Sequence, residues 1–185
     1  MKKIIIFAAM AFVSVAAFAQ PKFAHVNFQE LYQLMPEADQ ARATMTATQN
    51  EAMETYQTMI EEYQSKATQY QQKVSTWTQT VRESKEKELA DMQQRIAEFE
   101  QSIQQELAAQ QNELMAPLVQ KAQEAVSSLA KAGSYIYVFD TSQMLYIDPA
   151  QSTDLTPAAR KALNIPEGRT LETLQAELQA AAQGQ

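Results

Sequence analysis

Apolar residues recur at helical spacing through most of this chain. Between Met53 and Val81 they fall at alternating intervals of three and four residues. A repeat sustained for this length is typical of a coiled-coil seam rather than of an ordinary amphipathic helix. A second run with the same spacing extends from Leu89 to Ile103, out of phase with the first. The intervening residues 82–88 are all polar. The pattern therefore predicts two long helical segments.

Two arrangements fit these segments, either one continuous helix with a phase slip or a hairpin that turns near residues 82–88. Residues 37–116 contain neither glycine nor proline, so no residue type marks a turn. The stretches 37–81 and 89–131 are almost equal in length, and at ~1.5 Å per residue each would extend roughly 65 Å. Arms of equal length return the chain to its starting point. This favours the hairpin, with residues 37–131 as an arm.

Short apolar segments flank the predicted arm. Residues 23–27 read as a strand followed by a helix start, because Asn27 and Glu30 have the spacing of a capping box. Gly133 is placed to end the second helix, and residues 135–140 and 144–148 read as two further strands. Three such short strands cannot form a stable core alone. We therefore expect oligomerisation to complete a small β body through Phe23, Val26, Ile136, Val138, Phe139, Leu145, Tyr146 and Ile147.

The first residues have the features of an export signal. Basic Lys2 and Lys3 precede an apolar stretch, and Ala17 and Ala19 are the small residues that a signal peptidase recognises, so we expect cleavage after Ala19. A membrane anchor is the alternative, but the apolar stretch is shorter than the ~20 residues that span a bilayer. The predicted fold class is α+β. Its divisions are the signal 1–19, the first body segment 20–36, the arm 37–131, the second body segment 132–166 and a tail 167–185.

Composition excludes several kinds of chemistry. The chain has no cysteine, one histidine and three dispersed glycines, so thiol chemistry, a histidine pair for a metal and a phosphate-binding glycine loop are all excluded. A structural role is expected for His25. Removal of the signal would change the formal net charge from −7 to −9. We predict no catalytic, cofactor-binding or metal-binding residue, and the protein is not expected to be an enzyme.

Charge is unevenly distributed along the arm. Residues 37–72 and 88–131 are each net acidic, whereas residues 73–87 are mildly basic. The predicted tip residues are Lys73, Trp77, Arg82, Lys85 and Lys87. They form either a solvated turn or a contact point for acidic or membrane partners. The tyrosines and Trp77 could also stack on single-stranded nucleic acid, but acidic arms argue against phosphate binding.

Methionines flank the predicted seam. Met is an adaptable side chain that promiscuous binding surfaces use. The candidate contacts for flexible partners are Leu34, Met35, Met45, Met59 and Met115. The alternative is that these residues only widen the core between the helices.

The order of signal, strand, long helical hairpin and closing strands resembles the OmpH/Skp family of periplasmic chaperones. The similar segments are Ala24–Leu31 at one end and Tyr137–Tyr146, Asp154–Thr156 and Lys161–Leu163 at the other. The resemblance implies a homotrimer whose helical arms enclose a cavity, without a cofactor or ATP. It also implies that unfolded outer-membrane proteins are held there during transit through the periplasm. The net acidity of this chain argues against lipopolysaccharide or anionic-membrane contact.

The sequence and the resemblance together leave two candidate functions. The first is an ATP-independent periplasmic holdase, in which many weak contacts retain an unfolded chain. The second is a structural coiled-coil adaptor or spacer of the cell envelope. Glutamine- and tyrosine-rich arms with a phase slip suit a flexible holder better than a rigid spacer.

Overall fold

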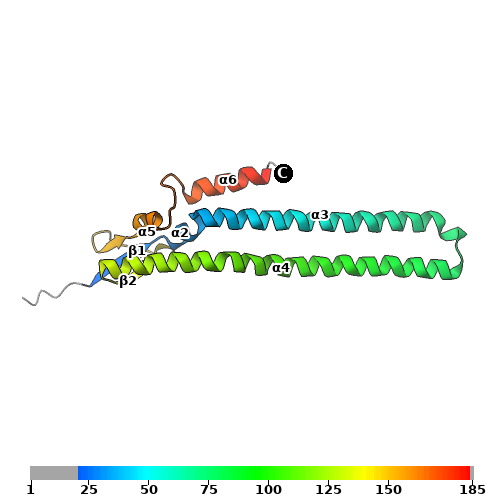
Figure 1. The fold of residues 1–185 in the computed structure, drawn as a ribbon, viewed down its shortest axis with the longest axis horizontal. Coiled ribbons are helices and arrows are strands. Elements are labelled where there is room, and N and C mark those ends of the chain that lie inside the picture. Colours follow the sequence, from blue (N-terminus) through cyan, green and yellow to red (C-terminus); the bar gives the residue numbers. More distant parts are fainter. Residues whose placement is uncertain (1–20, 184–185) are drawn as a thin grey trace, which may run out of the picture.

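A computed structural model describes residues 21–183, which form a small body, a long helical hairpin and a C-terminal helix beside the root of the hairpin (Figure 1). The predicted signal, with Ala17 and Ala19, lies outside these residues. The elements in chain order are β1 (Lys22–Val26), α2 (Phe28–Leu34), α3 (Pro36–Lys73), the 3₁₀ turn η1 (Val74–Thr76), α4 (Gln79–Gly133), β2 (Tyr135–Asp140), the 3₁₀ turn η2 (Thr141–Gln143), β3 (Ser152–Asp154), α5 (Thr156–Ala162) and α6 (Leu171–Gln183).

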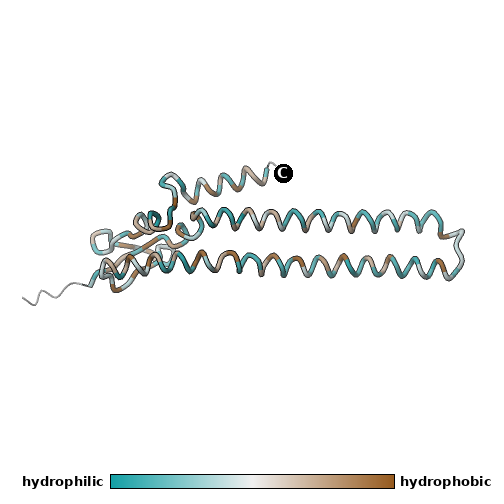
Figure 2. The backbone as a smooth tube through the Cα atoms, in the orientation of Figure 1, coloured by the Kyte–Doolittle hydropathy of each residue, from teal (hydrophilic) through white to brown (hydrophobic). Residues whose placement is uncertain are grey.

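The predicted antiparallel hairpin is present, formed by α3 and α4. Its register is visible in contacts between the two helices, from the Glu37–Lys121 ion pair at the root to the hydrogen bond that Gln110 Nε2 donates to Thr48 Oγ1, 3.0 Å long. Apolar positions recur among polar ones along both helices (Figure 2). Because only two helices pack together, most of their seam is half-buried, and Met92 is its one buried side chain between residues 42 and 117.

The predicted bend near 82–88 is wrong, because the chain turns at residues 74–78. The Thr78 hydroxyl caps α4 by accepting the backbone N–H of Val81, and Thr76 Oγ1 donates to the Lys73 carbonyl at 2.8 Å. Hydroxyl side chains thus satisfy free backbone groups at both helix ends, and the turn needs no glycine. Residues 82–88 are exposed or half-buried first turns of α4. Their polar character reflects their exposure at the end of the hairpin.

The body contains a parallel sheet in the order β2-β1-β3. The predicted strand at 135–140 is confirmed, but the one at 144–148 is not. Asp140 Oδ1 accepts the N–H of Ser142 and Asp148 Oδ1 that of Ala150, which turns the chain at both ends of this segment. Residues 144–151 instead cross from one edge of the sheet to the other, because β3 pairs with the opposite side of β1.

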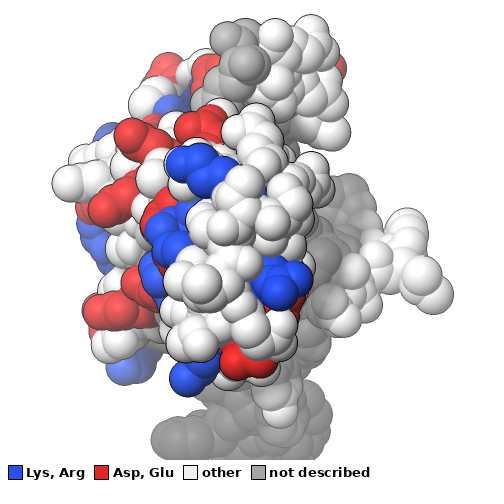
Figure 3. All heavy atoms as spheres, turned by 90° about the vertical axis from the view of Figure 1, so that its right-hand side faces the viewer, with Lys and Arg blue, Asp and Glu red and all other residues white. Residues whose placement is uncertain are grey.

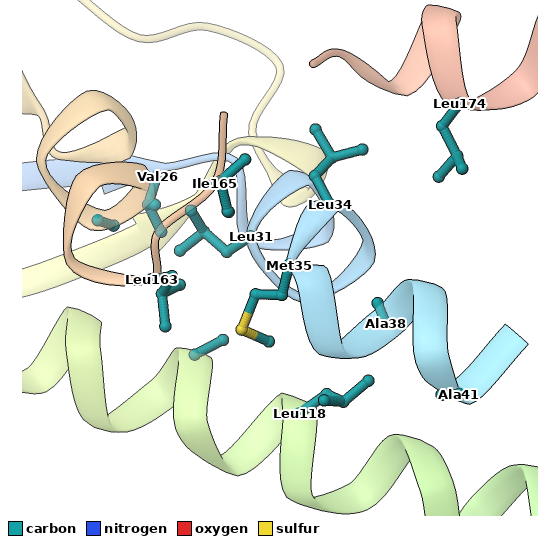
Figure 4. Packing of buried hydrophobic residues seen from close by; sticks show 12 residues of the cluster. Val26, Leu31, Leu34, Met35, Ala38, Ala41, Leu118, Leu163, Ile165 and Leu174 are labelled. Atoms are coloured by element: carbon teal, nitrogen blue, oxygen red, sulfur yellow. The ribbon is translucent and has the colours of Figure 1, made fainter. Parts of the chain in front are cut away.

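One face of this sheet is covered within the same chain. Val26 packs in a core with Leu31 and Leu34 of α2, with Met35 after this helix and with Leu118 of α4 (Figure 4). The expected cap is present, since Asn27 Oδ1 accepts the N–H of Glu30 at 3.2 Å. The expectation that oligomerisation covers Val26 is therefore wrong, because Val26 is already buried within its own chain. The helices α2, α4 and α5 cover it.

The end of α4 differs in detail from the expectation. Ser134, rather than Gly133, takes the left-handed conformation, with φ of 56°. A Cβ atom at Gly133 would overlap the ring of Tyr135. Glycine is therefore needed here for close approach of the first side chain of β2 rather than for its own dihedral angles.

The tail folds back onto the body. Arg160 pairs with Glu30, and its Nη2 donates to the carbonyls of Pro166 and Arg169 at 2.7 and 2.6 Å. Arg169 in turn pairs with Asp39 of α3. Leu174 of α6 completes the core beside these ion pairs. Residues 164–183 are thus fixed to the root of the arm, a position the sequence did not predict.

Candidate functional site

Three tyrosines of α3 contact polar side chains of α4 at intervals of seven residues. Tyr56 hydrogen-bonds to Glu100, Tyr63 Oη accepts from Gln93 Nε2 at 2.5 Å, and Tyr70 Oη donates to Glu86. We call these pairs the tyrosine ladder. The neighbouring carboxylates raise the pKa values of Tyr56 and Tyr70, because the hydrogen bond and the negative charge both favour the protonated phenol. The ladder therefore holds the two helices in register through polar contacts.

A groove of about 430 Å³ lies between the two helices at the middle of the arm. Its apolar walls come from both helices, and it is open to solvent. Met53 is 68 % exposed at its edge. The lining residues are Gln49, Ala52, Met53, Tyr56, Phe99, Glu100, Ile103, Gln104 and Leu107. We call this the arm groove. A two-helix seam has no third helix to close it, so apolar surface stays accessible there.

The two stretches that form the walls of the arm groove are acidic. Residues 45–60 and 96–111, which contribute its two walls, contain five carboxylates and no lysine or arginine. Glu100 is part of the lining itself. Nearer the turn, Lys66 and Lys85 hold the pKa of Glu88 at about 2 through direct hydrogen bonds. Lys66 and Lys85 are therefore paired near the turn, whereas the two stretches that form the groove carry negative charge and no basic residue.

The residues predicted to contact flexible partners are distributed differently from the expectation. Leu34 and Met35 are completely buried in the core, so their prediction as accessible contacts is wrong. The turn between α2 and α3 brings them under α5. Met115 packs against the same core. Met45 and Met59 are half-buried on α3 and remain predicted contacts.

The tip residues lie together at the far end of the hairpin. Lys73 ends α3, Trp77 lies in the turn, and Arg82, Lys85 and Lys87 belong to the first turns of α4. Trp77 is half-buried and packs against Tyr70 with ring centroids 5.9 Å apart. Seen from this end, basic side chains lie among acidic and uncharged ones (Figure 3). A contact with membrane or acidic partners remains a prediction.

The second face of the sheet carries an exposed aromatic cluster. The rings of Phe23, Tyr137 and Phe139 lie 6.0–6.4 Å apart. Of the remaining residues predicted for the oligomeric body, Ile136 and Tyr146 are exposed, Leu145 is fully exposed, and Val138 and Ile147 are half-buried. We call Phe23, Tyr137, Phe139, Leu145 and Tyr146 the body patch; Ile136 lies on the opposite face of β2, because side chains alternate along a strand. A contiguous apolar surface of this kind marks an interaction site.

The single histidine lies on this face in the central strand β1, with a structural partner. His25 Nδ1 is 2.8 Å from Ser152 Oγ, which joins β1 to β3. Among residues 21–183 no group of three His, Cys, Asp or Glu side chains is placed to hold a metal ion. No helix within that range has the length and apolarity needed to cross a membrane.

The arm groove was only partly visible in the sequence. The apolar spacing places Met53 and Tyr56 in the first run and Phe99 and Ile103 in the second. Their juxtaposition depends on the register of the hairpin. The misplaced bend would have paired Tyr56 with other residues of α4. The true register could have been found from the hydroxyl residues Ser75, Thr76 and Thr78 and from matching the tyrosines with polar partners.

The fold defines a class of protein in which a helical hairpin extends from a small sheet. Comparison identifies the family. The sequence profile of the OmpH-like outer membrane protein family matches residues 22–163, and the chain belongs to this family. The family resemblance stated above is thus confirmed.

A solved structure from Caulobacter crescentus, described as a candidate OmpH-like outer membrane chaperone, has the same fold. The two structures superpose with a TM-score of 0.70 at 16 % sequence identity, covering 79 % of this chain and 85 % of the other. At this identity the likeness shows the fold. No curated protein sequence matches this chain. The helix α6 lies beyond the part of the chain that the family profile matches.

Proposed function

We propose that this protein is an ATP-independent holdase chaperone of the periplasm, exported by cleavage after Ala19, which retains unfolded outer-membrane proteins between helical arms. The observation that carries the proposal is the open seam of the arm. A structural spacer would bury its apolar residues, whereas here Met53 is mostly exposed beside an apolar groove. Membership of the OmpH-like family supports a chaperone role.

The proposed assembly is a homotrimer held by the body patch. Leu145 is fully exposed and Tyr146 is 80 % exposed, next to the cluster of Phe23, Tyr137 and Phe139. The outer edges of β2 and β3 are unpaired within the described part of the chain, and such edges readily accept another strand. A closed assembly would cover this surface and direct several arms to the same side, where a cavity could form.

Retention of a client in such a cavity needs no single strong site. Several arms offer weak apolar contacts at once. Once the first contact has formed, each further contact joins molecules that are already held together, so it forms more readily. The client can therefore move within the cavity and still remain bound. Flexible Met side chains such as Met45 and Met59 would adapt to clients of different sequence.

Aggregation of a urea-denatured β-barrel protein, diluted with and without the mature chain, tests the function. We expect light scattering to be suppressed at one trimer per client, and size-exclusion chromatography with light scattering to give a trimer that gains the mass of one client. The matched variant Leu145→Glu should yield smaller species and lose suppression. A wild-type trimer that leaves aggregation unchanged would instead support the spacer function.

A further inference from the structure

We propose that the arm groove is a binding site for short cationic and apolar segments of an extended polypeptide, so that this chaperone selects clients by positive charge beside aromatic or aliphatic side chains. The proposal rests on the proposed function and adds a specificity to it. It depends on three features of the groove, namely its size, its exposed apolar wall and its charge.

The size of the groove suits a few extended residues. Its α3 wall runs from Gln49 to Tyr56, which at ~1.5 Å per helical residue is roughly 10 Å long. An extended chain advances about 3.3 Å per residue, so about three residues fit along this length. The groove volume of about 430 Å³ holds one or two large apolar side chains. A helical partner would need a longer trough than the groove provides.

The walls supply the apolar contact. Met53 is flexible and mostly exposed on one side, while Phe99 and Ile103 contribute the opposite wall. Burial of an entering side chain against them releases water from apolar surface, which favours binding. Because Met adapts its rotamer to what it contacts, the groove should accept aromatic and aliphatic side chains alike.

The charge around the groove selects the flanking residues. Five carboxylates and no basic residue belong to the two stretches that form its walls, and Glu100 lies in the lining. Glu100 contacts the neutral phenol of Tyr56, so its negative charge is not neutralised by that partner. A lysine or arginine next to the bound apolar side chain therefore meets complementary charge, whereas an acidic neighbour is repelled.

The first test uses labelled peptides that share one apolar core and differ in flanking lysines, serines or glutamates. With the mature chain, we expect the lysine peptide to bind about tenfold more tightly than the glutamate peptide, a difference that two or three exposed charge pairs provide. The preference should shrink as salt screens the charges. Glu100→Gln should weaken binding of the lysine peptide and leave the affinity for the serine peptide unchanged. The control Glu83→Gln, at the exposed start of α4, should change neither.

The second test uses the absence of cysteine from the chain. A Met53→Cys variant carries a single thiol at the groove, and a Val81→Cys variant carries one at an exposed position outside it. We expect the lysine peptide to slow alkylation at position 53 and not at position 81. Slow alkylation at 53 without peptide would mean that a second copy of the arm fills the groove, and would overturn the proposal.

The outcomes separate this proposal from the general function. Suppressed aggregation of a full-length client, together with equal affinity for all three peptides, would refute the groove as a charge-selective site and leave the holdase function intact. Loss of peptide binding in Glu83→Gln as well as in Glu100→Gln would also refute it, because the effect would then belong to net charge rather than to the groove.

Discussion

Replacing Leu174 by alanine tests whether α6 is an integral part of the body. Leu174 is 5 % exposed and packs in the core, whereas Leu178, one turn further along the same helix, is 49 % exposed. Truncation of a buried leucine to alanine costs about 2–5 kcal/mol, through lost burial and the cavity that remains. Because Leu174 lies at the edge of the core, we expect Leu174→Ala to lower the free energy of unfolding by about 2–3 kcal/mol. At the half-exposed Leu178, substitution by alanine should lower the free energy of unfolding by less than about 1 kcal/mol.

The assay is urea-induced unfolding followed by circular dichroism at one fixed protein concentration, combined with hydrogen exchange of the amides in 171–183. A helix as short as α6 is marginal in isolation, so loss of the Leu174 contact should release it and accelerate exchange there before the arm is affected. The Arg169–Asp39 ion pair is half-buried, and a single ion pair contributes too little to replace the lost apolar contact. Equal effects of the two substitutions, or unchanged exchange in α6, would refute the reasoning that Leu174 anchors the tail.

Three further predictions concern the cap and the arm. Asn27→Ala should lower the free energy of unfolding by about 1 kcal/mol, because it removes the cap of α2; no change in urea unfolding would contradict this. The pKa of Glu88 is lowered from 4.5 to about 2, chiefly by Lys66, so its contribution to stability is complete above pH 4.5 and is lost as the pH falls towards 2. Thermal melting over this range should show the loss, and Glu88→Gln should flatten it; an unchanged pH profile in the variant would exclude this pair as the cause. Tyr63→Phe removes the hydrogen bond from Gln93 and should cost up to about 1 kcal/mol, measured by urea unfolding, with aggregation suppression retained; loss of suppression without loss of stability would mean that the hydroxyl contacts clients.

The helical hairpin and the cap at Asn27 could be predicted because they depend on local patterns. Seam spacing from Met53 to Tyr70 is a property of one helix and is independent of the rest of the fold. The bend was misplaced for the same reason, since Trp77 and Val81 continue the spacing beyond the end of α3. Helical spacing alone does not indicate that Thr78 is the N-cap of α4.

The sheet and the client contacts depended on long-range pairing and were predicted less well. Residues 144–148 have strand-like composition, but the free edge of β1 is taken by Ser152–Asp154. Leu34 and Met35 resemble accessible residues in an amphipathic pattern, and only the packing of α4 and α5 around them buries them. A single sequence does not encode which apolar residues face a partner element and which face solvent.

The seam of the arm stays open because polar contacts, rather than close apolar packing, hold the two helices together. A two-helix hairpin built on close leucine packing would gain stability by shortening the distance between its helices, and its seam would then be inaccessible. Here the tyrosine ladder and the ion pairs of Lys66 and Lys121 fix the register of the two helices. The apolar residues between them need not pack tightly to define the fold. The seam can therefore keep the arm groove accessible while the register is maintained, and Glu100 both takes part in the ladder and contributes to the charge of the groove. In this arm the polar contacts serve stability, and the apolar residues they leave uncovered are available for binding.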